Sequence, residues 1–238
     1  IKDMKSLIKS FLLKFSKYLY RIFLESKFIN KRDGVVDLLS HEAKIQSKEY
    51  FEEYLDKILL FYTRKSFWTY NLDNLIKEGV VLEFGVFKGH SINFMSNTLK
   101  DKLFFGFDSF EGLQEDWKGS GLAKNHFSLR GKLPKVNDNV NLISGWFSST
   151  LPQFLKNFND QICLIHIDCD TYESSKEVLS MLKDYIDKGT VIIFDEYFGY
   201  PGWKTGEYKA LQEFIIEQNI NYKYLAISNQ GCCSIQII

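Results

Sequence analysis

The sequence has no excess of charge of either sign. Among its 238 residues, 30 lysines and arginines balance 30 aspartates and glutamates, so the formal net charge is zero. A chain without net charge has no overall field that would attract nucleic acid or steer a polyanion. The composition therefore argues against a nucleic-acid partner and favours a small substrate that is recognised locally.

Cysteines and long apolar runs are also scarce. The four cysteines, Cys163, Cys169, Cys232 and Cys233, lie in or beside apolar segments and lack the C-x-x-C spacing of a zinc site. We expect buried, reduced thiols in a cytoplasmic protein. Lysines interrupt every N-terminal window long enough to span a bilayer, and no small-residue cleavage site follows, so neither a membrane span nor a secretory signal is favoured.

The first 30 residues carry a basic amphipathic pattern. Apolar residues recur there at helical spacing, together with seven basic and two acidic side chains. Three uses of such a helix stay open: packing on the chain's own body, packing on a second subunit of a homo-oligomer, or contact with an anionic membrane surface. Because the pattern stays mostly helical and polar up to residue 78, we predict a helical extension or cap over 1–78 and an α/β domain over 79–238.

From Gly79 onward, short apolar runs alternate with helical stretches, which is the signature of βαβ units. The turn residues 228–231 separate the last two apolar runs and favour a hairpin. We therefore predict a parallel sheet that ends in an antiparallel hairpin. The predicted strands lie near 80–84, 103–108, 140–144, 162–168 and 189–195, with hairpin runs at 222–227 and 233–238. The predicted helices lie near 90–99, 148–158, 173–187 and 206–219.

Two acidic pairs each follow a β-branched apolar run. Asp168 and Asp170 close the first run, and Asp195 and Glu196 close the second. Ligands of open α/β sheets bind outside the carboxyl ends of such strands, so the four carboxylates are expected to face one cleft. Converging carboxylates repel one another unless a proton or a hard cation compensates, which points to a Mg²⁺, Mn²⁺ or Ca²⁺ site. The alternative is that Asp170 and Glu196 are solvated loop residues.

A glycine turn follows the first predicted strand of the α/β domain. Gly85 and Gly89 let the backbone turn tightly beside a ligand, and Ser91 is placed to help cap the next helix. The acid Glu83 before this turn would repel a pyrophosphate but suits the ammonium of an amino-acid cofactor. Asp108 ends the next strand, where a carboxylate can hold both ribose hydroxyls. The turn and the acid together indicate nucleoside binding, and the alternative is two ordinary loop acids.

Five motifs follow one another in order between residue 79 and residue 238. They are Glu83-Phe84-Gly85-Val86-Phe87-Lys88-Gly89-His90-Ser91, Asp108-Ser109-Phe110-Glu111-Gly112-Leu113, Gly145-Trp146-Phe147-Ser148-Ser149-Thr150-Leu151-Pro152, Asp168-Cys169-Asp170-Thr171-Tyr172-Glu173-Ser174 and Asp195-Glu196-Tyr197. In this order they resemble the macrocin O-methyltransferase family. The resemblance implies a class I methyltransferase (Rossmann-like) fold with a seven-stranded, mostly parallel sheet, S-adenosylmethionine as the methyl donor and a divalent metal, usually Mg²⁺.

The resemblance also implies roles for individual residues. It assigns Glu83, Gly85, Gly89 and Ser91 to the methionine part of the cofactor, Asp108 to the ribose, Ser109 and Phe110 to the adenosine, and Gly145, Trp146 and Phe147 to the adenine. It assigns Asp168, Asp195 and Glu196 to the metal, with Asp170 as a fourth ligand. The chemistry of the reaction needs a group that accepts the hydroxyl proton, and we expect Asp168 to be this base, with His90, His126 and Lys176 as weaker candidates. Glu196 departs from the Asp or Asn of many relatives.

The predicted function is metal-dependent methyl transfer from S-adenosylmethionine to a hydroxyl of a sugar or glycosylated small molecule. Thr171 stands where catechol enzymes carry a lysine base, which disfavours a catechol acceptor. Two alternatives stay open: another acceptor, such as a cell-surface glycan precursor, and a non-catalytic scaffold. The polar, glycine-containing segment 115–135 suits a lid, and the aromatic segment 197–203 suits a platform for a sugar ring, although such aromatics equally often pack on helices.

Overall fold

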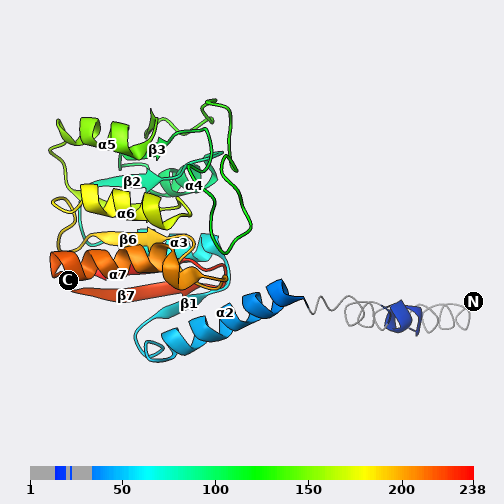
Figure 1. Cartoon of the computed structure of the whole chain (residues 1–238). Helices are drawn as coiled ribbons and strands as arrows, with labels where there is room; N and C mark the ends of the chain where they lie inside the picture. The colour runs from blue at the N-terminus through cyan, green and yellow to red at the C-terminus, as the bar shows by residue number, and fades with distance from the viewer. Residues whose placement is uncertain (1–13, 20–21, 23–33) are drawn as a thin grey trace, which may run out of the picture. The chain divides into compact units, whose positions relative to one another are not determined.

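The structure is a computed structural model that describes residues 14–19, 22 and 34–238 (Figure 1). Residues 14–19 are helical, and the rest of the amphipathic pattern predicted for residues 1–30 lies outside the described residues apart from Ile22. The chain divides into two compact units, Ile1–Leu39 and Ser40–Ile238. None of the helices among the described residues combines the length and the apolar character that a membrane crossing needs. The predicted boundary at residue 78 stays a prediction.

The second unit is built around one mostly parallel sheet. Its strand order is β1-β7-β8-β6-β5-β2-β3-β4, and only β8 runs antiparallel to its neighbours. Strands β2, β5 and β6 are buried along their whole length, as their continuous apolar runs predict. The strands are β1 (Leu59–Phe61), β2 (Val80–Phe84), β3 (Phe104–Asp108), β4 (Val140–Ser144), β5 (Ile162–Ile167), β6 (Val191–Phe194), β7 (Tyr222–Ser228) and β8 (Cys233–Ile237).

The predicted seven-stranded sheet is wrong by one strand. Within the described residues the sheet has eight strands, because β1 pairs in parallel with β7 and places Leu59 opposite Ala226. This strand has only three residues, and Leu59 and Leu60 are exposed. So short a run has too few positions for an alternating pattern to show, and its pairing depends on a strand more than 160 residues later in the chain.

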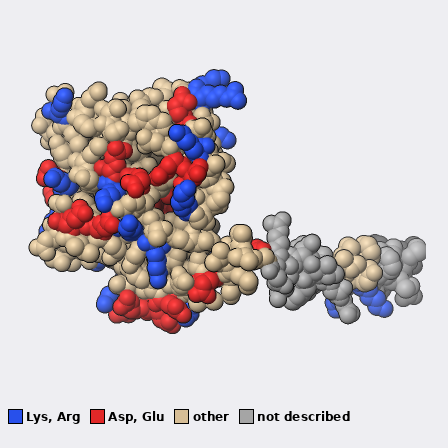
Figure 2. Space-filling model, viewed as in Figure 1, with Lys and Arg blue, Asp and Glu red and all other residues tan. Residues whose placement is uncertain are grey.

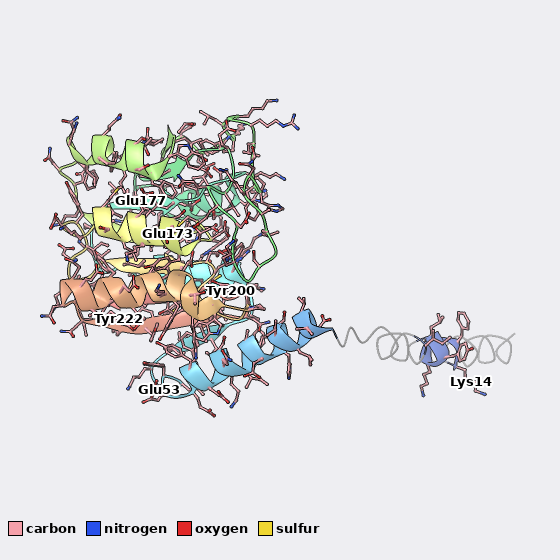
Figure 3. All side chains as sticks on the ribbon, in the orientation of Figure 1. Lys14, Glu53, Glu173, Glu177, Tyr200 and Tyr222 are labelled. Carbon is pink, nitrogen blue, oxygen red and sulfur yellow. The ribbon has the colours of Figure 1, made fainter. Side chains whose placement is uncertain are left out.

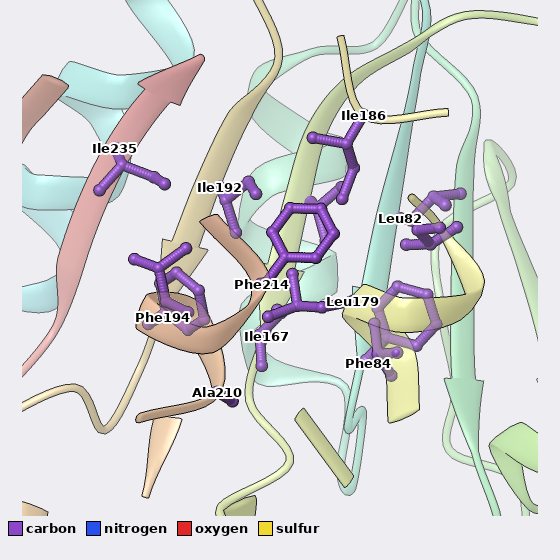
Figure 4. Close-up of a cluster of buried hydrophobic side chains, with 14 of the residues drawn as sticks. Leu82, Phe84, Ile167, Leu179, Ile186, Ile192, Phe194, Ala210, Phe214 and Ile235 are labelled. Atoms are coloured by element: carbon purple, nitrogen blue, oxygen red, sulfur yellow. The ribbon is translucent and has the colours of Figure 1, made fainter. Parts of the chain in front are cut away.

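Helices cover both faces of the sheet (Figure 1). Apolar side chains of α5, α6 and α7 pack on one face, and those of α3 and α4 pack on the other. Figure 4 shows the first of these layers, where Leu179 and Phe214 meet Ile192 and Phe194. The helices are α2 (Val35–Glu52), α3 (Arg64–Asp73), α4 (His90–Thr98), α5 (Phe147–Leu155), α6 (Tyr172–Met181) and α7 (Glu207–Gln218), with a short 3-10 turn, η1 (Trp203–Thr205), before α7.

The surface of the protein carries mixed charges. Lysine and arginine side chains lie among aspartate and glutamate side chains on the face shown in Figure 2. This interspersion agrees with the zero net charge of the sequence.

The four cysteines are buried and unpaired.

The carboxyl ends of β2, β3, β5 and β6 meet at one edge of the sheet. Strand β2 lies between β3 and β5, so the turn after β2 lies beside the residues that follow β5. Gly85 has a φ of +92°, and a Cβ atom at this position would collide with the carbonyl oxygen of Asp168. A glycine is required there because any side chain would separate the two turns. This close contact brings the glycine turn and the first acidic pair to one site.

Candidate active site

A cavity of about 300 Å³ opens at this edge of the sheet. Residues of the glycine turn and of the end of β3 line one part of it, and the two acidic pairs line another. The helix α3, which precedes the α/β pattern in the sequence, contributes Arg64 and Trp68. The cavity therefore combines the two halves that the sequence predicted with residues that it did not single out.

Asp108 organises the first half of the cavity. One oxygen of its carboxylate, Oδ2, accepts hydrogen bonds from the backbone N–H groups of Val86 (2.8 Å) and Phe87 (2.7 Å), and Oδ1 accepts one from Phe110 (2.7 Å). Phe87 and Phe110 both have positive φ angles, which few residues with side chains adopt. The carboxylate therefore holds two strained turns together at the edge of the cavity.

Glu83 lies beneath the glycine turn and is fully buried. Its Oε1 accepts a hydrogen bond from the Ser91 hydroxyl at 2.9 Å, and its Oε2 lies 3.0 Å from Nδ1 of His166. Burial raises the pKa of Glu83, and the His166 contact opposes this rise. Burial would lower the pKa of His166, but Asp195 and Glu83 outweigh it, so that pKa stands well above its usual range. His166 thus lies between Glu83 and Asp195 and links the glycine turn to the acidic half.

The second half is a cluster of carboxylates. Oxygen atoms of Asp168, Asp170 and Glu196 all lie within 4.8 Å of one another, and so do ligand atoms of His166, Asp168 and Asp195. Asp170 adopts a left-handed backbone conformation with φ of +64°. Strained residues of this kind concentrate at functional sites. Asp168 belongs to both groups, so a cation bound in either group would have Asp168 as a ligand.

Electrostatic effects separate the carboxyl groups of the cluster. Burial and the charge of Asp195 raise the pKa of Asp168 well above its usual range, and burial with Asp195 raises that of Asp170 to about 7. Burial would also raise the pKa of Asp195, but His166 and Arg64 outweigh it and lower that pKa. Without a cation, the cluster therefore keeps Asp195 ionised and resists ionising its neighbours.

Three charged residues of the site were not assigned from the sequence. Arg64 reaches the cluster from the first turn of α3, with Nη2 2.6 Å from Oδ2 of Asp195 and 3.0 Å from Oε1 of Glu196. Glu207, at the start of α7, is fully buried and accepts a hydrogen bond from the backbone N–H of Glu196 at 3.1 Å. His166 lies inside β5, whose other residues are apolar and predict a buried core strand. Arg64 and Glu207 belong to no local motif, so only the fold brings them to the site, whereas His166 lies two residues before Asp168 in the sequence.

The residues assigned from the sequence fall into two groups. Those that line the cavity are Gly85, Ser91, Asp108, Ser109, Trp146, Phe147, Asp168, Asp170, Asp195 and Glu196. Those that lie near it without lining it are Glu83, Gly89, Phe110 and Gly145. The alternative that Asp170 and Glu196 are solvated loop residues is wrong, since Asp170 is buried and both side chains line the cavity.

Of the weaker base candidates, His90 lines the cavity, whereas Lys176 pairs with Glu213 at 2.9 Å. His126 is exposed and does not line it.

The aromatic segment 197–203 packs mainly in the core and does not line the cavity. Tyr197 and Trp203 are fully buried and contact Tyr208 of α7. Tyr200, labelled in Figure 3, contacts the ring of Trp117, which does line the cavity. The predicted sugar platform is therefore wrong for segment 197–203, because its rings satisfy the packing of α7. The aromatic lining comes instead from Trp68, Phe87, Trp117, Phe127, Trp146 and Phe147.

This architecture is the class I methyltransferase fold, with its antiparallel strand near one edge of the sheet. Residues 82–197 match a family described as "Methyltransferase domain". The calicheamicin methyltransferase CalS11 has a similar structure, with a TM-score of 0.57 and 22% identity over 72% of this chain and 76% of that one.

Two curated relatives are O-methyltransferases. One is the 8-demethyl-8-(2,3-dimethoxy-alpha-L-rhamnosyl)-tetracenomycin-C 4'-O-methyltransferase of Streptomyces olivaceus, 26% identical over 54% of this chain and 58% of the relative. The other is the demethyldecarbamoylnovobiocin O-methyltransferase of Streptomyces niveus, 26% identical over 64% of each chain. The chain thus spans less than two thirds of the length of either relative.

Proposed function

We propose that this protein is a metal-dependent O-methyltransferase of the macrocin type. It transfers the methyl group of S-adenosylmethionine to a hydroxyl of a sugar or glycosylated small molecule. The observation that carries the proposal is the single cavity in which the glycine turn and Asp108 face a cluster of four carboxylates. The names of the two curated relatives, which refer to a rhamnosyl tetracenomycin and to demethyldecarbamoylnovobiocin, support an acceptor of this class.

The first half of the cavity suits the cofactor. Asp108 accepts a hydrogen bond from a ribose hydroxyl at Oδ1, which has one backbone hydrogen bond, whereas Oδ2 already has two. Gly85 and Ser91 border the methionine part, and Trp146 and Phe147 border the adenine. Glu83 is too deeply buried to line the cavity, so it acts on the methionine ammonium through Ser91 and through its negative charge.

The second half suits a hard divalent cation. Its donors are carboxylate oxygens, which Mg²⁺ and Mn²⁺ prefer. Oxygen atoms of Asp168, Asp170 and Glu196 lie within 4.8 Å of one another, and Asp195 joins Asp168 in a second group with His166. Oε2 of Glu196 is buried and has no hydrogen-bond partner, as expected for an atom with a ligand still to bind. We assign Asp168, Asp170, Asp195 and Glu196 to Mg²⁺. When bound, this ion lowers the pKa of an acceptor hydroxyl and fixes its oxygen.

The protein's own residues supply positioning and proton transfer. A sulfonium methyl is already activated, so the main task is to hold a hydroxyl oxygen in line with the S–CH₃ bond. Asp168 is placed for the proton transfer, because it lies between the glycine turn and the acidic cluster. It accepts the proton of the acceptor hydroxyl as the oxygen–methyl bond forms and the sulfur–methyl bond breaks. Trp117 and Phe127 exclude water from the acceptor side.

A methyl-transfer assay tests this proposal. Labelled S-adenosylmethionine is incubated with the protein and with sugars, nucleotide sugars, glycosylated small molecules and catechols, once with Mg²⁺ and once with EDTA. We expect metal-dependent labelling of a sugar-containing acceptor and none of the catechols.

The outcomes separate the parts of the proposal. Labelling that survives EDTA would keep the methyltransferase and remove the metal. Labelling of catechols alone would overturn the acceptor class. No S-adenosylmethionine binding in isothermal titration calorimetry would overturn the enzyme and favour a scaffold.

A further inference from the structure

Arg64 is the only lysine or arginine among the described residues that forms an ion pair with the four carboxylates assigned to the metal. It does so from outside the region that matches the methyltransferase domain, which begins at residue 82. Thr63 caps the start of α3 by accepting a hydrogen bond from the N–H of Ser66, so the helix holds Arg64 at the cavity edge. The side chain is 39% exposed, which leaves it a path away from the cluster.

The guanidinium contacts only half of the cluster. It takes Oδ2 of Asp195 and Oε1 of Glu196, while Asp168 and Asp170 have no lysine or arginine partner in the described part of the chain. Oε2 of Glu196 stays free and buried. Three of the assigned ligands thus offer an oxygen atom that Arg64 does not contact, whereas Arg64 occupies Oδ2 of Asp195.

Both oxygen atoms of Asp195 are already engaged. Oδ2 lies 2.6 Å from Arg64, and Oδ1 accepts a contact from Sγ of Cys232 at 3.1 Å and lies 3.9 Å from Nε2 of His166. A divalent cation and a guanidinium repel each other and use the same carboxylate lone pairs. A cation that binds Oδ2 of Asp195 therefore has to displace Arg64.

We propose that Arg64 is a built-in counter-cation that the protein exchanges for its divalent metal. In the metal-free protein it neutralises Asp195 and Glu196 and keeps them in position. On metal binding Arg64 leaves Asp195. The free-energy cost of breaking this ion pair lowers the affinity of the site for the metal. This inference rests on the metal site of the proposed function and adds to it a residue that sets how tightly that site binds.

Metal affinity measures the exchange without any assay of activity. The full-length chain is freed of metal with EDTA and dialysed, and Mn²⁺ is titrated in while free Mn²⁺ is followed by electron paramagnetic resonance. The variants are Arg64→Gln, which removes the competing charge, and Arg64→Lys, which keeps it. Lys65→Gln is the matched control, because it removes the same charge from an exposed neighbour on the same helix that contacts none of the carboxylates.

We expect Arg64→Gln to bind Mn²⁺ about ten-fold more tightly than the wild type, the effect of losing one competing charge at contact distance in a half-buried site. Arg64→Lys should lie between the two, and Lys65→Gln should stay within about two-fold of the wild type. Equal or weaker binding by Arg64→Gln would overturn the exchange and make Arg64 a structural anchor of α3. Failure of the wild type and Arg64→Gln to bind Mn²⁺ would remove the metal site and this inference together, and would leave methyl transfer to be judged by its own assay.

Thermal unfolding provides a second readout and checks folding. In EDTA, Arg64→Gln should melt below the wild type, because two carboxylates lose their cation. Saturating Mn²⁺ should then raise its melting temperature by more than it raises that of the wild type. An equal rise in the two proteins would contradict the exchange.

Discussion

At the scale of single residues, the site separates two neighbouring aspartates by their surroundings. His166 and Arg64 hold Asp195 ionised against the effect of burial, whereas burial and the charge of Asp195 itself raise the pKa of Asp168. Groups whose surroundings push their pKa values apart are suited to different roles. Asp195 is suited to be a permanent anion that anchors a cation, and Asp168 is suited to exchange a proton.

This separation predicts the effect of Asp168→Asn. The change keeps the size of the side chain but removes its charge and its ability to accept a proton, so methyl transfer should fall at least about 100-fold. Binding of S-adenosylmethionine, measured by calorimetry, should change less than about three-fold, because the cofactor contacts lie on the other half of the cavity. The matched control is Asp160→Asn, an exposed acid just before the opposite end of β5. Unchanged methyl transfer in Asp168→Asn would remove its role as base.

A second prediction at this scale concerns Gly85. In Gly85→Ala the new Cβ meets the Asp168 carbonyl at a positive φ, so the turns after β2 and β5 must move apart. Gly121→Ala is the control, because its φ of +81° is similar but nothing lies within 4 Å of its Cβ position. In urea titrations the control should lose roughly 1 kcal/mol of unfolding free energy, and Gly85→Ala about 3 kcal/mol or more. Equal losses would mean that the close approach to Asp168 is not needed.

At the scale of secondary-structure elements, the sequence predicts the α/β domain well. Continuous β-branched runs such as Val191–Phe194 are typical of buried central strands, and the positions of β2 to β8 agree with the predicted runs to within a few residues. Helix α6 begins where Thr171 caps it. The edge strand β1 could not be predicted, because its three residues become a strand only when β7 is beside them.

The packing of α6 against α7 leads to a prediction on pH. Glu213 of α7 accepts hydrogen bonds from the Tyr172 hydroxyl (2.6 Å) and the Lys176 ammonium (2.9 Å) of α6, and these contacts lower its pKa to about 2. Because the pKa of Glu213 is lower in the folded than in the unfolded protein, its contacts stabilise the folded protein at pH values above the unfolded pKa, near 4.5. This stabilisation is lost as the pH falls toward 2. Glu213→Gln should therefore lower the urea midpoint slightly at pH 7 and less at pH 3. The neighbouring exposed acid Glu217 has no such contacts, so Glu217→Gln should show no change at either pH. If the urea midpoint of Glu213→Gln fell further below that of the wild type at pH 3 than at pH 7, the result would contradict the proposed contacts.

At the scale of the whole molecule, the site is only partly local in sequence. The glycine turn, Asp108 and the two acidic pairs lie at strand ends, and parallel strands bring their carboxyl ends together, so the sequence predicts these groups at one edge. Arg64 and Trp117 line the same cavity from α3 and a long loop, and Glu207 of α7 lies beneath it, bonded to the backbone N–H of Glu196. Tertiary packing sets the positions of these residues, and their spacing in the sequence does not predict them.

The last prediction concerns assembly. Tyr18 and Leu19, in the described helical stretch 14–19, are 61% and 49% exposed, and an exposed apolar stripe is costly unless a partner covers it. We expect the chain to form a homo-oligomer, and this stripe is a candidate for the subunit contact, beside packing on the chain's own body. Removal of residues 1–30 should then lower the mass measured by light scattering, and Leu19→Gln should shift the assembly toward the smaller species. Lys17→Gln, on the same stretch but off the apolar stripe, should leave the mass unchanged. An unchanged mass after removal of residues 1–30 would refute the subunit contact, and loss of binding to anionic vesicles in the same variant would assign the stripe to a membrane surface instead.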